Sequence, residues 1–141
     1  MFKENEIALD FVFDLDSPKE IFQVVMEYAD KSGKGEWASF GYAFAQSSTV
    51  VVMRLKEDGY IVGYIAGNFL PTNDFFVQHG YVRSPIDGCS RLLERIAQKI
   101  SLQYDMPIGN MIIHSDKPEK LWEKWGFEVS NEKIFKRNIG G

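Results

Sequence analysis

Residues 81–93 read YVRSPIDGCSRLL, and this stretch decides the fold of the chain. An extended apolar run ends here, a short polar loop containing Gly88 follows, and a strongly helical segment begins at once. A strand that passes into a helix through such a loop directs free backbone N–H groups and the positive end of the helix dipole toward whatever lies in front. The pattern favours a phosphate or diphosphate site at this joint.

The composition around this stretch is that of one globular domain. The chain has 141 residues, 45% hydrophobic and 26% charged, without repeats or linkers, so residues 1–141 should form a single domain. The net charge is -4 and Lys and Arg form no dense block, which argues against a nucleic-acid partner. The single cysteine, Cys89, can form neither an internal disulfide nor a thiolate metal site. We therefore expect no metal. No apolar run suits a signal peptide or a membrane span, so we expect a cytoplasmic protein.

Hydrophobic periodicity gives the expected order of elements. Strands are expected at residues 7–13, 49–55, 60–68, 74–82 and 110–114, with one or two more between 127 and 137. Helices are expected at residues 17–30, 90–104 and 117–125, and residues 36–46 are ambiguous but helix-like. The acidic residues at 4–6 are typical of solvated surface.

The helix over residues 90–104 joins two strands, and this crossover should place strands 74–82 and 110–114 parallel. The expected fold class is therefore α/β of the α+β type. It has a mixed, mostly antiparallel sheet of six to seven strands with helices on both faces.

Two short motifs carry a resemblance to a known family. Leu92 and Leu93 follow the loop just inside the helix, and residues 121–127 read LWEKWGF near the carboxyl end. They resemble the paired leucines after the R-x-x-G-x-G/A loop, and the L-Y-E-K-x-G-F motif, of the GNAT superfamily of acetyl-CoA-dependent N-acetyltransferases. With the order of elements, the resemblance covers residues 7–139 and implies an acyl-CoA N-acyltransferase-like fold.

The loop departs from the family's pattern. Counted back from Leu92, its three signature positions fall at Ser84, Asp87 and Cys89, where the family prefers Arg, Gly, and Gly or Ala. An aspartate that faces a diphosphate would repel it, although neighbouring arginines could offset the charge. Trp122 stands where many members have the tyrosine that protonates the departing thiolate, and an indole N–H can donate a hydrogen bond but cannot act as an acid.

The resemblance implies acetyl-CoA as the acyl donor. Its pantetheine arm would add to the edge of strand 74–82, its diphosphate would lie on N–H groups near Gly88, and its thioester would lie between strands 74–82 and 110–114. The residues implied in donor binding are Tyr81, Val82, Arg83, Asp87, Gly88, Cys89, Ser90, Arg91, Ser115 and Trp122.

The acceptor amine must lose a proton before it attacks, which requires a base or a water chain. His79 is the catalytic candidate because it lies on the strand beside the expected thioester, and Gln78 next to it faces the other way. His114 is a second candidate. The alternative for each histidine is a polar residue on a half-exposed strand. Cys89 at a helix start could be a nucleophile, but the packing of a small residue is the favoured interpretation.

We expect an N-acetyltransferase that moves an acetyl group to an amine of a small molecule or peptide by direct attack in a ternary complex. Asp87, Cys89 and Trp122 favour an alternative, a catalytically inactive GNAT-fold binding or structural module. A regulator that only binds CoA or a nucleotide lies between the two. The sequence does not encode the acceptor in readable form, and exposed edge strands near the carboxyl end leave a homodimer open.

Overall fold

A computed structural model of the chain describes residues 1–15, 19–31, 47–114, 122–131 and 134–139. The expected helix over residues 36–46, most of the expected helix over 117–125, and Ser115 lie outside the described residues. The elements are β1 (Phe2–Lys3), the 3-10 helix η1 (Glu4–Glu6), β2 (Ile7–Phe11), the 3-10 helix η2 (Val12–Asp14), α1 (Lys19–Lys31), β3 (Thr49–Leu55), β4 (Ile61–Phe69), β5 (Phe75–Val82), β6 (Ile86–Asp87), α3 (Cys89–Tyr104), β7 (Asn110–His114), β8 (Glu128–Asn131) and β9 (Ile134–Asn138).

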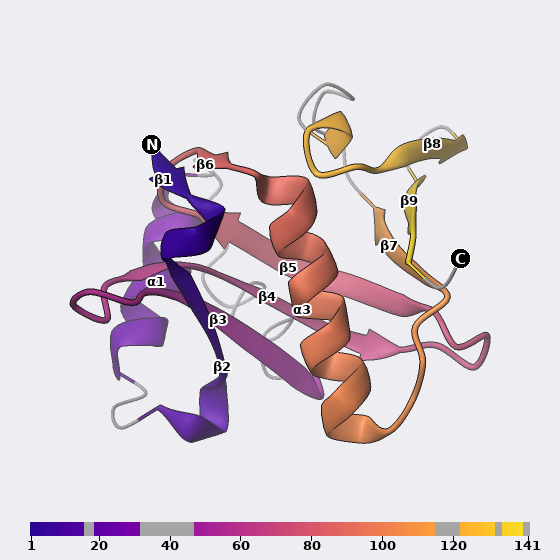
Figure 1. Cartoon of the computed structure of the whole chain (residues 1–141), viewed down its shortest axis with the longest axis horizontal. Coiled ribbons are helices and arrows are strands. Elements are labelled where there is room, and N and C mark those ends of the chain that lie inside the picture. The colour runs from indigo at the N-terminus through magenta and orange to yellow at the C-terminus, as the bar shows by residue number, and fades with distance from the viewer. Residues whose placement is uncertain (16–18, 32–46, 115–121, 132–133, 140–141) are drawn as a thin grey trace.

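Seven strands form the main sheet, in the order β2-β3-β4-β5-β7-β9-β8. Every neighbouring pair is antiparallel except β5 and β7, which run parallel across the α3 crossover. The predicted mixed, mostly antiparallel sheet and the predicted parallel pair are both confirmed. In Figure 1 the strands β7, β9 and β8 turn away from the half of the sheet formed by β2 to β5.

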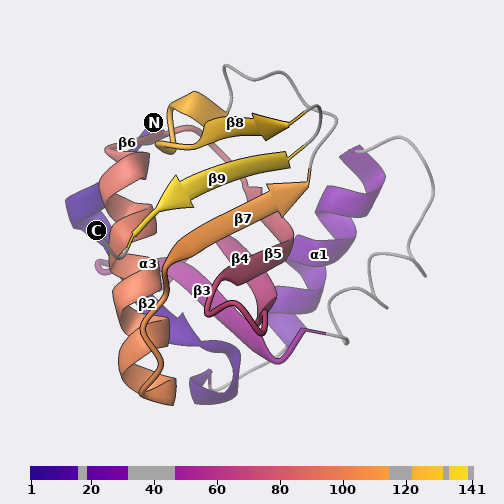
Figure 2. The same cartoon turned by 90° about the vertical axis from the view of Figure 1, so that its right-hand side faces the viewer.

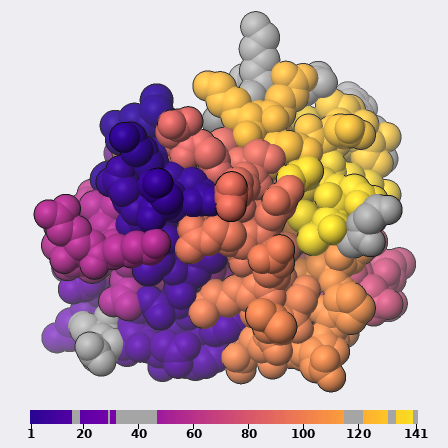
Figure 3. Space-filling model, viewed as in Figure 1, coloured from indigo at the N-terminus to yellow at the C-terminus, as the bar shows by residue number. Residues whose placement is uncertain are grey.

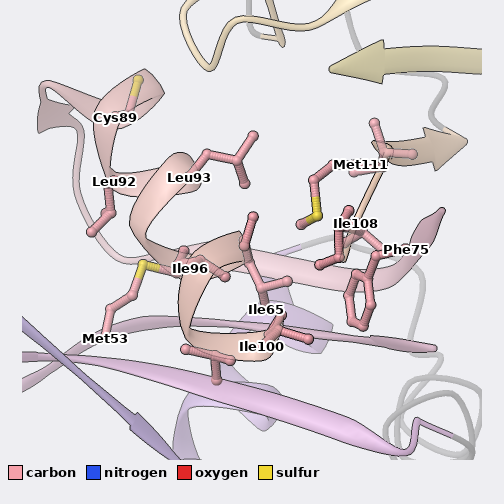
Figure 4. Close-up of a cluster of buried hydrophobic side chains, with 14 of the residues drawn as sticks. Met53, Ile65, Phe75, Cys89, Leu92, Leu93, Ile96, Ile100, Ile108 and Met111 are labelled. Atoms are coloured by element: carbon pink, nitrogen blue, oxygen red, sulfur yellow. The ribbon is translucent and has the colours of Figure 1, made fainter. Parts of the chain in front are cut away.

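The helices α1 and α3 cover opposite faces of the sheet, as Figure 2 shows. Strand alternation explains the division, because Val51 and Met53 face the α3 side while Val50 and Val52 face the α1 side. On α3 the buried residues recur at helical spacing and pack into the larger core, part of which is drawn in Figure 4. These helix residues are Leu92, Leu93, Ile96, Ala97 and Ile100.

The amino-terminal residues lie against the start of α3, which the sequence did not predict. β1 pairs in parallel with β6, the short strand just before α3, through Phe2 with Ile86 and Lys3 with Asp87. Figure 3 shows these first residues beside the helix. The interpretation of residues 4–6 as solvated surface is wrong for Glu4, whose side chain is 12% exposed and forms ion pairs with two arginines of α3. Within the described ranges, none of the helices has the length and hydrophobicity needed to cross a bilayer.

Candidate active site

The parallel strands β5 and β7 are paired at one end only. Their register joins Phe75 with Met111, Phe76 with Ile112, and Val77 with Ile113. β5 then continues to Val82 with no strand beside it on the β7 side in the described part of the chain. Residues 78–82 therefore present an unpaired strand edge, to which an extended ligand can add.

A β-bulge produces this divergence. Gly67 pairs with Val77 and Ala66 with His79, so Gln78 is an extra residue in β5. A bulge bends its strand and increases its twist, which here takes β5 away from β7. Gly67 makes the close approach possible, because a Cβ placed on it would lie 2.1 Å from the carbonyl oxygen of Phe76.

The unpaired half of β5 borders a pocket of about 210 Å³ beneath α3. A cavity of about 150 Å³ holds a benzene ring, so this pocket has room for about eight non-hydrogen atoms. None of the described residues that line it is charged. The sheet contributes Met53, Ile65, Val77, Gly80 and Val82, and Tyr64 and Tyr81 also border the pocket. The other lining residues are Leu93 of α3, Ile113 of β7, and Trp122, Trp125 and Phe127 near the carboxyl end.

Gly80 lies at the centre of the strand segment that borders the pocket. Its φ is not among the positive values, which in the described chain belong to three other glycines and to Asn73 and Asp105. A Cβ placed on it would meet Ile65, Val77 and the carbonyl oxygen of Tyr64 at 3.7–3.9 Å, ordinary van der Waals distances. Neither backbone conformation nor crowding therefore requires a glycine here. The absence of a side chain at Gly80 leaves space in the pocket. The sequence analysis missed this residue.

The first turn of α3 is built as the loop pattern predicted. Gly88 is the N-cap residue in the left-handed conformation, with φ 81° and no side-chain cap. Cys89 is buried, and its Sγ donates a hydrogen bond to the carbonyl oxygen of Lys124 at 3.0 Å. Burial raises the pKa of the Cys89 thiol, which disfavours the thiolate and fits the packing interpretation rather than a nucleophile. This contact ties the start of α3 to the turn that follows Trp122.

Negative charge also lies at this turn. Asp87 is exposed, and Cβ of Glu4 lies 3.0 Å from where a Cβ on Gly88 would stand. Arg91 is largely exposed and its Nε lies 3.2 Å from the Glu4 carboxylate. Arg95 also forms an ion pair with Glu4, so the Glu4 charge is balanced and Asp87 is the exposed acidic side chain beside this turn.

The bulge places His79 on the α1 side of the sheet. Strict alternation along the strand would have put the His79 side chain on the same face as Val77. The extra residue Gln78 moves it to the opposite face. His79 is 7% exposed, its Nδ1 lies 2.8 Å from Tyr64 Oη, and its ring lies 5.0 Å from that of Tyr28 on α1. Burial raises the pKa of Tyr64 far above its ordinary value, with the nearby Tyr28 and Tyr81 adding to the effect, so this phenol stays protonated.

A second polar group on the α1 side lies around Glu27, which the sequence analysis also missed. Tyr81 Oη donates to Glu27 Oε1 at 2.9 Å, and Arg83 Nε donates to Glu27 Oε2 at 3.0 Å. Burial opposes ionisation of Glu27, but hydrogen bonds from Tyr81 and Lys31 and the Arg83 charge hold its pKa below the ordinary value. Arg83 is thus engaged away from the first turn of α3.

The predicted site residues fall into three groups. Tyr81, Val82 and Trp122 border the pocket, and Asp87, Gly88, Cys89, Ser90 and Arg91 lie at the first turn of α3. His79 and Arg83 make their contacts on the α1 side. His114 is exposed at the end of β7, and Ser115 lies outside the described residues.

Sequence comparison with protein-family models and with curated proteins gives no match. Solved structures do match. The aminoglycoside 6'-N-acetyltransferase from Enterococcus faecium has a TM-score of 0.64 and 9% identity, covering 94% of this chain and 97% of that one. A GNAT family acetyltransferase from Brucella melitensis, solved with acetyl-CoA, has a TM-score of 0.59 and 13% identity, covering 96% and 89%. An acetyltransferase of the GNAT family from Staphylococcus aureus Mu50 has a TM-score of 0.58 and 13% identity, covering 94% and 99%.

The similarity extends over nearly the whole chain and includes the mostly antiparallel seven-stranded sheet with a helix on each face. At these identities it establishes architecture rather than activity. The chain therefore has the fold of the GNAT acetyltransferases.

Proposed function

We propose that the protein transfers an acetyl group from acetyl-CoA to an amine. The observation that carries the proposal is the one-ended pairing of β5 with β7, which leaves a strand edge and an uncharged pocket side by side. A thioester arm has an amide-bearing backbone that suits the strand edge and apolar segments that suit the pocket. Solved structures of this fold with acetyl-CoA, such as the Brucella melitensis protein, support the choice of donor.

In this proposal the first turn of α3 holds the diphosphate through the N–H groups near Gly88, Cys89 and Ser90. Asp87 opposes this contact, whereas the Glu4 carboxylate is ion-paired with Arg91 and Arg95. Arg91 and the helix dipole supply the favourable charge. Donor binding then depends more on the arm and less on the phosphates.

The acceptor amine would approach the edge of β5 from the α1 side. His79 lies on that side and remains the candidate base. In this role the neutral imidazole would donate its Nδ1 proton to Tyr64 Oη, and its lone pair on Nε2 would take the proton. Tyr64 would then be a positioning residue. Most of the rate would come from holding the amine and the thioester together.

Two measurements test the proposal. Acetyl-CoA should raise the melting temperature, since a ligand at 100 times its Kd adds about 2.7 kcal/mol. Free thiol should then appear when members of an amine panel are added. Gly80→Val, which places a side chain in the pocket, should abolish both signals. No melting shift at millimolar acetyl-CoA would contradict donor binding.

His79 is tested separately from donor binding. His79→Ala should keep the acetyl-CoA melting shift, lower the rate of thiol release, and remove the pH dependence of that rate near neutrality. His114→Ala, at an exposed position on the end of β7, is the comparison for the second candidate. An unchanged pH profile in His79→Ala would remove this histidine from the mechanism.

A second candidate function is a module that binds CoA without catalysis. The exposed Asp87 carboxylate beside the first turn of α3 and the indole in place of an acidic phenol at Trp122 favour it. A melting shift with acetyl-CoA but no thiol release across the amine panel would select this function.

A further inference from the structure

One hydrogen-bond donor in the pocket wall has no acceptor. Nε1 of Trp122 is buried and makes no hydrogen bond within the described residues. Buried indole N–H groups usually find a partner, so an exception calls for an explanation. We propose that the Trp122 N–H binds a carbonyl oxygen on the arm of the acyl donor. The inference rests on the proposed function and assigns one atom of the protein to that ligand.

The pocket-lining side chains offer this N–H no substitute acceptor. Apart from the indoles, the polar side-chain groups among them are the hydroxyls of Tyr64 and Tyr81. Tyr64 Oη is bonded to His79 Nδ1, and Tyr81 Oη donates to Glu27. The remaining lining side chains are apolar, so none of the described side chains around the pocket supplies the acceptor, and a bound ligand can.

The indole is fixed in place by its neighbours. Its ring packs edge-on against Phe127, with the ring centroids 6.1 Å apart, and in a tilted arrangement against Phe135, with the centroids 6.3 Å apart. The carbonyl oxygen of Trp122 accepts hydrogen bonds from the backbone N–H groups of Trp125 and Phe127. A donor held this firmly loses little freedom when it binds, and it selects ligands that place an oxygen at one position.

The chemistry favours a neutral carbonyl oxygen. An indole N–H does not release its proton, so Trp122 can donate a hydrogen bond throughout the reaction without acting as an acid. In an uncharged pocket such a bond is strong, and it strengthens further on an oxygen that gains negative charge as the amine attacks. Proton supply to the departing thiolate must come from another group or from water.

Trp125 provides a matched control. It also borders the pocket, but its indole nitrogen is not among the buried atoms that lack a partner. Trp122→Phe removes the N–H and keeps an aromatic ring, and Trp125→Phe makes the same chemical change at the neighbouring wall. We expect Trp122→Phe to weaken acetyl-CoA binding about tenfold, the effect of one lost hydrogen bond. Trp125→Phe should weaken it clearly less.

The direct experiment follows the indole ¹⁵N–¹H resonances of the intact protein. The chain has three tryptophans, and the Trp122 signal is identified by its loss in Trp122→Phe. On addition of acetyl-CoA this proton resonance should move downfield. S-ethyl-CoA, which lacks the thioester oxygen, identifies the acceptor. A shift with acetyl-CoA alone assigns the thioester carbonyl, and a shift with both ligands assigns an amide carbonyl of the arm.

The result that overturns the inference is a static Trp122 resonance at saturating acetyl-CoA, with saturation verified by the melting shift. Equal loss of affinity in Trp122→Phe and Trp125→Phe would also overturn it, because volume alone would then explain both. If acetyl-CoA produces no melting shift in the unmodified protein, the proposed function itself fails, and the two failures are thereby distinguished.

Discussion

Asp74 Oδ1 accepts two hydrogen bonds from Asn110, one from its backbone N–H at 2.9 Å and one from its side-chain amide at 3.0 Å. Asp74 precedes β5 and Asn110 begins β7, so this contact closes the end at which the parallel strands are paired. Thr72 Oγ1 donates to the second carboxylate oxygen at 2.8 Å. The strands are thus bonded tightly at one end and separate beyond Val77.

Asp74→Asn should destabilise the protein by about 1–2 kcal/mol at neutral pH, because the charged acceptor is lost. Burial opposes ionisation, but hydrogen bonds from Thr72 and Asn110 hold the pKa of Asp74 below its ordinary value. Its stabilising contribution is therefore present above the unfolded pKa of about 3.9 and disappears as the pH falls through the folded value. Urea denaturation at pH 7 and at acidic pH measures the difference.

The exposed Asp30 of α1 gives the control for this change. Asp30→Asn should leave the urea midpoint within experimental error. If Asp74→Asn lowers the free energy of unfolding by the same amount at pH 7 and in acid, the Asp74 carboxylate does not hold the strand junction in the way described.

Gly80→Val should separate stability from binding. The new side chain meets only ordinary contacts at the Cβ and extends into an apolar pocket, and valine suits a strand. We expect the free energy of unfolding to rise by about 1 kcal/mol while the melting shift with acetyl-CoA disappears. Calorimetry with and without acetyl-CoA measures both. A variant that still binds would place the ligand elsewhere.

Gly67→Ala should have the opposite effect on stability. A Cβ on Gly67 would lie 2.1 Å from the carbonyl oxygen of Phe76 and 2.7 Å from the ring of Phe75, so the backbone has to move. Overpacking against backbone costs about 3 kcal/mol or more. Urea denaturation should show a lower midpoint with an unchanged slope. Gly80→Ala on the adjacent strand is the matched control, and equal midpoints for the two variants would contradict the assigned bulge.

The buried phenol of Tyr64 should make the folded protein less stable at alkaline pH. Burial raises the pKa of its phenol in the folded protein, and the nearby Tyr28 and Tyr81 add to this. The stability that depends on the neutral phenol is fully present below the unfolded pKa of about 10 and decreases as the pH rises above it. Tyr64→Phe should flatten this decline in urea denaturation between pH 8 and 11. The control Tyr60→Phe, at an exposed position, should keep the decline. A free energy of unfolding that stays constant over this pH range in the unmodified protein would refute the prediction.

Asp87→Asn should tighten CoA binding a few-fold at low salt, because an exposed negative charge near the expected diphosphate is removed. The gain should vanish near 1 M salt, where the screening length is about 3 Å. Isothermal titration at two salt concentrations measures it. Glu57→Gln, in the turn between β3 and β4, changes the net charge equally and should have little effect. Equal effects of the two variants would mean that Asp87 does not face the phosphates.

Sequence reasoning succeeded where local pattern and chain connectivity determine structure. The apolar stripe from Leu92 to Ile100 indicated α3, and its crossover required β7 to run parallel to β5. Gly88 was correctly placed at the start of the helix, where its left-handed φ suits glycine.

Features that depend on contacts distant in sequence were not predictable in the same way. The bulge at Gln78 arises from the pairing of β5 with Gly67, and nothing in residues 74–82 alone indicates an extra residue. It nevertheless decides on which face His79 lies. The burial of Glu4 likewise depends on Arg91 and Arg95. Gly80 could have been found from sequence as a glycine that interrupts a strand pattern without a turn nearby.

The contacts of Glu4 also bear on the order in which the nascent chain matures. Arg95 donates hydrogen bonds to the carbonyl oxygens of Glu4 and Ile7, partners 91 and 88 positions earlier in the chain. At ribosomal rates of about 5–20 residues per second, such a separation corresponds to roughly 5–18 seconds of synthesis. Through that interval the early segment has no helix to dock on, so the loop before α3 reaches its final shape only after translation has passed Arg95.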